Sequence, residues 1–328
     1  MFVKTYADLN ILPRCDILGS GFSAKGTGDM AKTLPKRSNF LGLEKEFSSL
    51  ETSRVAIVSA PYEHTVSYGG GTKLGPKAIL QASQYVEFYD EETTREIFRD
   101  AGIATLPPIN FKGKKDADAL RLIQQAVEDL LSMGKFVVTL GGEHTISSAP
   151  VAAYLQKYPD LSILQFDAHS DLRDEYQGSK YSHACVMMRI CDMLDPQRVV
   201  QVGIRAQCKE EADFIRTRGV KTFYAHGIRD GTYMRFLKTW DDFVVAALTD
   251  HVYITFDVDA FDPSIMPATG TPEPNGLYWN EVLQCLRQVA RKKTIVGFDV
   301  VELAPMKGLS HPNLTTAKLV SKILNYAL

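Results

Sequence analysis

The sequence predicts an α/β protein, a three-layer α/β/α sandwich with a mainly parallel sheet of about eight strands. Strand-type runs alternate with helix-type runs along the chain after residue 50, and no linker or internal repeat divides this part. The strand-type runs are apolar almost throughout, which is typical of parallel strands covered by helices on both faces. We therefore expect residues 51–328 to form one domain and residues 1–50 to form an arm or loop packed on it.

The expected elements follow from the spacing of apolar residues. Strands are short apolar runs that end at polar or glycine-rich turns, and the chain contains these at 55–58, 136–140, 163–166, 199–202, 252–256 and 294–301. A first helix is expected to begin near Pro76, because proline suits the first helical turn. The remaining expected helices, which have helical spacing or character, cover 116–133, 146–155, 184–191, 209–217, 232–248, 279–291 and 315–328.

Composition excludes several classes of protein. The 328-residue chain has a formal net charge of −2, so no general basic field favours nucleic acid. No run approaches the roughly 18 apolar residues of a membrane helix. The five cysteines form no CxxC pair, and the N-terminus lacks the pattern of a signal peptide. We expect a cytoplasmic protein that binds neither nucleic acid nor membrane.

Four of the predicted strands are each followed directly, or within a few residues, by an acid or a histidine. In open parallel sheets, ligands bind beyond the carboxyl ends of the strands. Polar groups at these ends are thus expected to meet at one edge of the sheet. The residues concerned are His144, Asp167, Asp257 and Glu302.

The same strand ends carry a pattern of metal ligands. Residues two apart on an extended backbone face the same side, so an Asp-x-His-x-Asp run and an Asp-x-Asp run each present their ligands together. Each run alone has an ordinary reading as a polar loop or helix cap. Together, the four aspartates would carry a charge of about −4, which two divalent cations would cancel. Carboxylate-rich sets with two histidines suit Mn²⁺, with other divalent ions possible. The candidate ligands are His144, Asp167, His169, Asp171, Asp257 and Asp259.

Glycines at 69–75 have a spacing that suggests a phosphate-binding loop. Pro76 stands where such a loop requires lysine. We interpret this stretch as a flexible loop at the rim of a site.

Several motifs resemble those of the ureohydrolase family, the binuclear manganese enzymes that include arginases and agmatinases. They are Gly-Gly-Glu-His at 141–144, Asp-Ala-His-Ser-Asp at 167–171, Ser-His-Ala at 182–184, Phe-Asp-Val-Asp-Ala-Phe-Asp-Pro at 256–263 and Gly-Thr-Pro at 270–272. The resemblance covers roughly residues 40–328 and implies the same three-layer fold.

The resemblance also implies roles for individual residues. One manganese ion would be held by His144, Asp167, Asp171 and Asp257, and the other by Asp167, His169, Asp257 and Asp259. His183 matches a histidine that shuttles protons, and Glu302 matches the acid that pairs with the guanidinium of the substrate. Thr271 joins them as a substrate-binding candidate. The family commonly forms trimers or hexamers, so we expect a homo-oligomer.

The stretch after the first ligand run resembles the Asp-Leu-Arg-Asp-x-Tyr-x-Gly pattern of agmatinases. The expected reaction is therefore hydrolysis of agmatine to putrescine and urea. Arg173 lies in this stretch and leaves an alternative open, since it could bind the carboxylate of a guanidino acid. An ion pair between Arg173 and a loop acid is the preferred interpretation.

Other functions remain alternatives. Hydrolases of 4-guanidinobutyrate, guanidine or arginine share the same metal core. A deacetylase-like enzyme with one zinc ion shares the fold, but the paired Asp257 and Asp259 argue against it. An inactive scaffold homologue is the alternative from a different class, and it is disfavoured because every expected ligand is present.

Overall fold

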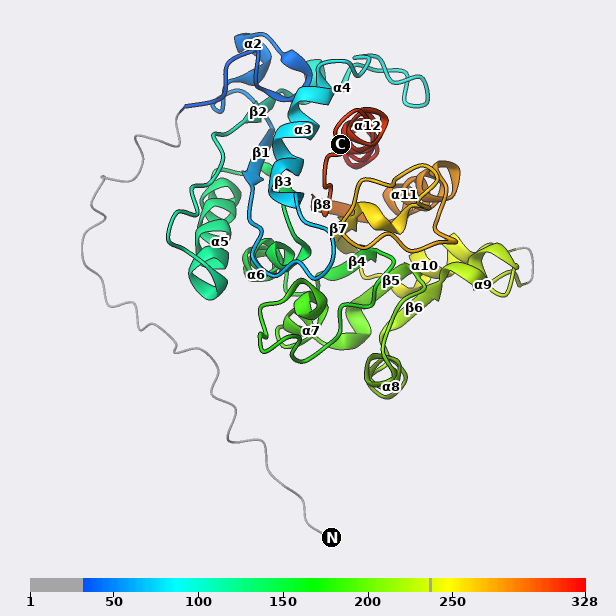
Figure 1. Cartoon of the computed structure of the whole chain (residues 1–328). Helices are drawn as coiled ribbons and strands as arrows, with labels where there is room; N and C mark the ends of the chain where they lie inside the picture. The colour runs from blue at the N-terminus through cyan, green and yellow to red at the C-terminus, as the bar shows by residue number, and fades with distance from the viewer. Residues whose placement is uncertain (1–31, 236–237) are drawn as a thin grey trace. The chain divides into compact units, whose positions relative to one another are not determined.

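The computed structural model describes residues 32–235 and 238–328. One sheet of eight strands forms its centre, in the order β2-β1-β3-β8-β7-β4-β5-β6 (Figure 1). Every neighbouring pair in this sheet is parallel. The predicted fold class is confirmed. The strands are β1 (Val55–Ala60), β2 (Ile103–Thr105), β3 (Phe136–Gly141), β4 (Ser162–Phe166), β5 (Val199–Ile204), β6 (Lys221–Tyr224), β7 (His251–Asp257) and β8 (Thr294–Val301).

Helices cover both faces of the sheet (Figure 1). Helices α3, α10, α11 and α12 pack in one hydrophobic layer, and α5, α6, α7 and α8 contribute to the other. In the described part of the chain, no helix is long and apolar enough to span a membrane. The helices are α2 (Lys45–Ser48), α3 (Gly75–Ser83), α4 (Ile97–Ala101), α5 (Asp116–Ser132), α6 (Ser148–Lys157), α7 (Val186–Cys191), α8 (Lys209–Arg218), α9 (Ala225–Arg229), α10 (Trp240–Ala247), α11 (Trp279–Lys292) and α12 (His311–Ala327).

The two hydrophobic layers explain why the strands are apolar without alternation. Leu164 and Phe166 of β4 point into the layer that contains α11 and α12, whereas Ile163 points into the layer that contains α5 and α6. Successive side chains of a strand face opposite sides of a sheet, so both must be apolar when both sides are covered.

Some predicted boundaries differ from the structure. The apolar runs do not predict strands β2 and β6, because these are edge strands of only three and four residues. The helix predicted at 232–248 is wrong at its start, since α10 begins at Trp240. Thr239 sets this start: its N–H donates to the carboxylate of Asp242 at 3.0 Å, as in a capping box.

Only part of the expected N-terminal arm can be described. Residues 1–31 lie outside the described residues. Within the rest of the arm, Phe40 and Leu43 are buried in the hydrophobic layer that contains α3. The boundary placed at residue 50 stays a prediction.

The strand order places the site. Strand β8, the last in the sequence, lies between β3 and β7, and β7 lies beside β4. The four strands that precede the predicted polar residues are therefore neighbours in the middle of the sheet. Their carboxyl ends form one continuous edge, as expected for a ligand site of an open parallel sheet.

A buried ion pair fastens the last helix to the loop before α4. Lys322 of α12 is 1% exposed, and its Nζ lies 2.8 Å from Oδ2 of Asp90, which is 2% exposed. Although burial raises the pKa of Asp90, the ion pair with Lys322 and a hydrogen bond from Thr93 hold it below its usual value. The ionised carboxylate therefore stabilises the fold.

Replacing Lys322 by methionine should destabilise the protein by about 3 kcal/mol at pH 7, because it leaves Asp90 buried without a cation. Because the pKa of Asp90 is lower in the folded protein than its value of about 3.9 in the unfolded chain, its ionisation stabilises the fold at pH values above about 3.9. This stabilisation is lost as the pH falls through the pKa of Asp90 in the folded protein. The difference from wild type should thus shrink below about pH 4. Urea unfolding at pH 7 and pH 3 measures this.

The matched control is Lys318→Met, since Lys318 lies 4.0 Å from Glu91 and its side chain is 29% exposed. An equal loss of stability in both variants would contradict a special role for the Lys322 pair.

Candidate metal centre and substrate pocket

The predicted ligands come together at the carboxyl ends of the central strands. His144 begins the 3₁₀ helix η3 (His144–Ser147) after β3, Asp167 directly follows β4, and Asp257 is the last residue of β7. Asp259 lies in the 3₁₀ helix η6 (Val258–Ala260) that follows. The sequence-based expectation of one edge shared by these side chains therefore agrees with the geometry.

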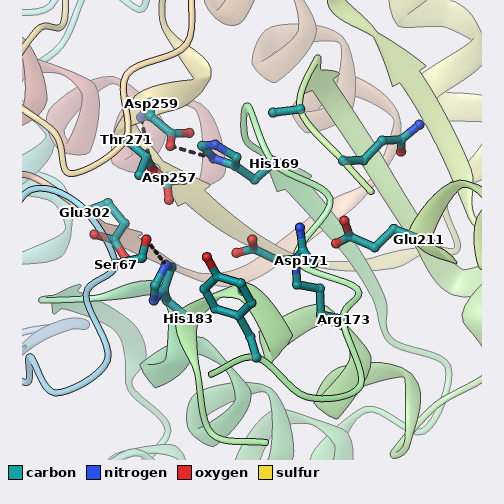
Figure 2. A pocket seen from close by; sticks show the side chains of 14 residues that line it. Ser67, His169, Asp171, Arg173, His183, Glu211, Asp257, Asp259, Thr271 and Glu302 are labelled. Atoms are coloured by element: carbon teal, nitrogen blue, oxygen red, sulfur yellow. Dashed lines mark hydrogen bonds and ion pairs between the residues drawn. The ribbon is translucent and has the colours of Figure 1, made fainter. Parts of the chain in front are cut away.

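The ligand atoms form two groups that share Asp167. In the first, Nδ1 of His144 lies 3.0 Å from Asp167 Oδ2, 3.2 Å from Asp171 Oδ2 and 3.4 Å from Asp257 Oδ2. In the second, Nδ1 of His169 lies 3.0 Å from Asp259 Oδ2 and 3.7 Å from Asp167 Oδ1 (Figure 2). Within 4.8 Å of one another lie the ligand atoms of His144, Asp167 and Asp257, and likewise those of Asp167, His169 and Asp259. Asp167 thus offers one oxygen to each group, as a bridging ligand would.

The orientation of His144 fits a cation. Its Nε2 lies 2.9 Å from the Thr255 hydroxyl, which donates in turn to Asp299 Oδ1 at 2.8 Å. Because the single hydroxyl proton goes to the carboxylate, Nε2 must be the donor to Thr255. Nδ1 is buried, has no hydrogen bond among the described residues, and faces three carboxylates. Although burial lowers the pKa of His144, these carboxylates raise it well above its usual value, so either a proton on Nδ1 or a metal cation must lie between the ring and the anionic oxygens.

Electrostatics point the same way. Burial and the neighbouring charge of Asp167 raise the pKa of Asp171 to about 7. Burial, with the charges of Asp259 and Asp167, raises the pKa of Asp257 well above its usual value. These carboxylates cannot all be ionised at neutral pH unless positive charge lies among them, which protonated His144 and His169 or divalent cations would supply.

The backbone around the ligands is held tightly. Asp171 and Glu302 adopt left-handed conformations, with φ of 51° and 63°, which costs a non-glycine residue about 1–2 kcal/mol. The guanidinium of Arg205 donates to the backbone carbonyls of Asp259 and Phe261 at 2.6 and 3.2 Å. Strain that the surroundings enforce is typical of functional sites.

A cavity of about 330 Å³ opens above the ligands. Figure 2 shows Glu302, Ser67 and His183 on one side, with Asp171, Arg173 and Glu211 on the other. All four residues predicted to bind substrate line this cavity: Arg173, His183, Thr271 and Glu302.

Glu302 and His183 have the surroundings of functional groups. Glu302 Oε1 accepts the backbone N–H of His144 at 2.6 Å, and burial and the charge of Glu143 raise the pKa of Glu302 well above its usual value. Burial lowers the pKa of His183 to about 4, so its imidazole is neutral at physiological pH.

The expected ion pair of Arg173 is wrong. Among the described residues, no acid lies within ion-pair distance of its guanidinium, which lies over the ring of Tyr176 at 4.9 Å. The neighbouring Asp174 pairs instead with Arg189 at 2.6 Å and Lys180 at 3.5 Å. Arg173 therefore lines the cavity without a direct ion pair among the described residues.

Several contacting residues were not identified from the sequence. Thr65 and Ser67 approach the His183 ring at 3.3 and 3.4 Å. Thr255 and Asp299 support His144 from two central strands. Their only sequence signal is that Thr255 and Asp299 are polar residues inside otherwise apolar strands.

The fold and the ligand cluster together define an α/β protein with a candidate metal site at the carboxyl ends of its parallel strands. More specifically, the chain belongs to the arginase family, whose model matches residues 53–328. This confirms the family inferred from the motifs, and with it the assignment of the chain as a hydrolase.

Relatives and solved structures support this placement. An N(1)-aminopropylagmatine ureohydrolase of Synechocystis sp. is 38% identical over 291 residues, which cover 87% of this chain and 92% of the relative. An agmatinase of Bacillus anthracis is 34% identical over 267 residues, 80% of this chain and 87% of that protein. The crystal structure of the agmatine ureohydrolase of Thermoplasma volcanium has a TM-score of 0.76 at 29% identity, covering 85% of this chain and 92% of that chain.

Replacing Thr255 by valine should weaken manganese binding about 10–100-fold, because it removes the acceptor that orients His144. Thr255→Ser keeps the hydroxyl and should bind manganese like wild type. Titration of the metal-free protein with Mn²⁺ measures this. Wild-type affinity in the valine variant would show that the His144–Thr255–Asp299 contacts do not orient a ligand.

Proposed function

We propose that the protein is a binuclear manganese hydrolase that converts agmatine and water to putrescine and urea. One observation carries this proposal: the two groups of histidine and carboxylate ligands lie at the base of a cavity whose wall carries the buried acid Glu302. A site with this arrangement offers divalent metals and an anionic partner for a planar cation in one place. The trimer or hexamer and the cytoplasmic location expected from the sequence stay predictions.

The metals would be held by the residues inferred from the motifs, with Asp167 and Asp257 as bridges. When bound, two manganese ions lower the pKa of water, so that hydroxide is available near neutral pH. Carboxylate-rich ligands with two imidazoles match the preferences of Mn²⁺. The proposed sets are His144, Asp167, Asp171 and Asp257 for one ion, and Asp167, His169, Asp257 and Asp259 for the other.

Glu302 would bind and orient the guanidinium. Its Oε1 already accepts the N–H of His144, while its remaining lone pairs are available to a planar cation. Burial raises the pKa of Glu302, and the positive charge of a bound guanidinium would offset the cost of keeping this buried carboxylate ionised. The buried acid is thus better satisfied with substrate than without it, which fixes the reacting carbon against the metal ligands.

His183 would move a proton. The attacking water loses a proton and the departing amine must gain one, so a neutral imidazole at the cavity wall can accept the first and supply the second. Its lowered pKa, about 4, makes the imidazolium a strong proton donor.

A longer substrate, N(1)-aminopropylagmatine, is a second candidate. Relatives named for this substrate from Synechocystis sp. and Thermus thermophilus are 38–39% identical to the chain, and one from Thermococcus kodakarensis is 34% identical, the same as the agmatinase of Bacillus anthracis. Glu211 lines the far side of the cavity, is 3% exposed and has no ion pair among the described residues. Its oxygens accept the backbone N–H groups of Leu172 and Cys208 at 2.9 and 2.7 Å, and a further lone pair of this carboxylate would accept the extra ammonium.

A guanidino acid is a third candidate, favoured by Arg173. A cation facing the cavity without an ion pair suits a substrate carboxylate. The same charge would repel the free ammonium of agmatine if the two came close.

The test is urea release from the manganese-loaded protein with agmatine, N(1)-aminopropylagmatine, 4-guanidinobutyrate, arginine and guanidine. We expect kcat/KM for agmatine or its aminopropyl derivative to exceed that for the other three by at least about 100-fold, equivalent to about 2.7 kcal/mol. Release from none of them, with both metal sites filled, would contradict the proposed function.

Two neutral variants separate the candidates in the same assay. Glu211→Gln should raise KM about tenfold for N(1)-aminopropylagmatine only, if Glu211 binds the distal ammonium. Arg173→Gln should raise KM about tenfold for 4-guanidinobutyrate only, if Arg173 binds a carboxylate. A variant with no effect on any substrate would remove the candidate that depends on it.

A further inference from the structure

A chain of hydrogen bonds lies behind His183 on the side away from the cavity. Glu143 is fully buried, and its Oε2 accepts the backbone N–H groups of His64 and Thr65 at 2.8 and 2.6 Å. Its Oε1 accepts the Thr65 hydroxyl at 3.1 Å. The same hydroxyl oxygen lies 3.3 Å from Nδ1 of His183 and accepts the backbone N–H of His183 at 3.0 Å.

The glycine before Glu143 makes this chain of contacts possible. A Cβ at Gly142 would lie 2.0 Å from the carbonyl oxygen of Tyr62, so only glycine lets the two loops approach this closely. The N–H of Glu143 donates to that same carbonyl at 2.9 Å. The Gly-Gly-Glu-His motif therefore also locks the loop that carries Thr65 against the strand end that carries His144.

The protons available for the hydrogen bonds between Glu143, Thr65 and His183 determine which ring nitrogen of His183 is protonated. The Thr65 hydroxyl has one proton and donates it to Oε1 of Glu143, whose two oxygens accept three hydrogen bonds in all. Thr65 Oγ1 must then accept from the ring, so the proton of a neutral His183 lies on Nδ1. Nε2 carries the lone pair, and it faces the cavity beside the Ser67 hydroxyl at 3.4 Å (Figure 2).

We propose that Thr65, held by Glu143, is a positioning residue that fixes the ring and the tautomer of His183 so that Nε2 is the proton acceptor toward the substrate. This inference rests on the proposed function for its catalytic meaning. In the reaction, Nε2 takes the proton lost by the attacking water and gives it to the amine nitrogen as the carbon–nitrogen bond breaks. Nδ1 keeps its proton throughout and stays hydrogen-bonded to Thr65.

The opposite tautomer would present an N–H group to the cavity. It could not accept a proton at Nε2, so the transfer to the leaving amine would fail although the substrate still binds. Loss of Thr65 is therefore expected to lower kcat and to leave KM nearly unchanged.

The kinetic test compares Thr65→Val, which has a similar shape without the hydroxyl, with Thr65→Ser, which restores it. We expect kcat for agmatine to fall 10–100-fold in the valine variant, with KM within threefold and manganese content unchanged. The serine variant should recover kcat to within about threefold of wild type. Wild-type kcat in the valine variant, or no recovery with serine, would overturn the proposal.

The tautomer of His183 can be measured directly, without an enzyme assay. Nitrogen-15 NMR of histidine-labelled, zinc-loaded full-length protein at pH 8.5 distinguishes the two ring nitrogens of each histidine. The His183 signal is assigned by its loss in His183→Asn. We expect the Nδ1–H form in wild type and Thr65→Ser, and a shift toward the Nε2–H form in Thr65→Val.

The kinetic and NMR tests distinguish failure of the inference about Thr65 from failure of the proposed function. A wild-type protein with the Nε2–H form overturns the inference about Thr65, even if it releases urea. A protein with the Nδ1–H form that hydrolyses no guanidino compound overturns the proposed function and leaves the positioning of the ring intact. If Thr65→Val does not fold, the wild-type spectrum still decides the tautomer.

Discussion

The structure depends on a group of carboxylates that is buried at the ends of adjacent parallel strands. Asp167, Asp171, Asp257 and Asp259 are each at most 6% exposed, and they lie close enough to repel one another strongly. Such a group is stable only with cations or protons among its oxygens. Neighbouring groups stabilise these buried carboxylates and fix their positions. Backbone N–H groups donate to Asp167, Asp257 and Asp259, and Arg205 donates to the backbone carbonyl of Asp259.

The order of the strands makes this concentration of charge possible. The first half of the chain builds β1 to β3, and β8 later enters the sheet between β3 and β7. Residues far apart in sequence therefore end side by side, as when the backbone N–H of His144 meets the carboxylate of Glu302 across 158 residues. The loops that follow these strands supply the cavity walls, so substrate choice can change while the ligand cluster stays.

The sequence predicts the central strands and the candidate ligands, because both depend on the order of residues within one short segment. Asp167, His169 and Asp171 alternate along one segment, and apolar runs mark the strands on which they depend. Contacts between distant loops could not be predicted in this way. The pairing of Thr65 with Glu143 spans 78 residues, and the nearby Asp174 pairs with Arg189 and Lys180 rather than with Arg173. Both are decided by packing rather than by spacing.

The most direct test of the central claim is the metal content and electron paramagnetic resonance of the full chain loaded with Mn²⁺. The account predicts two manganese ions per chain with the spectrum of an exchange-coupled pair, because Asp167 belongs to both ligand groups and Asp257 is proposed as the second bridge. It further predicts that Asp257→Asn loses the coupling and binds manganese more weakly. A single ion per chain, or two ions with uncoupled spectra in the wild type, would contradict a shared site.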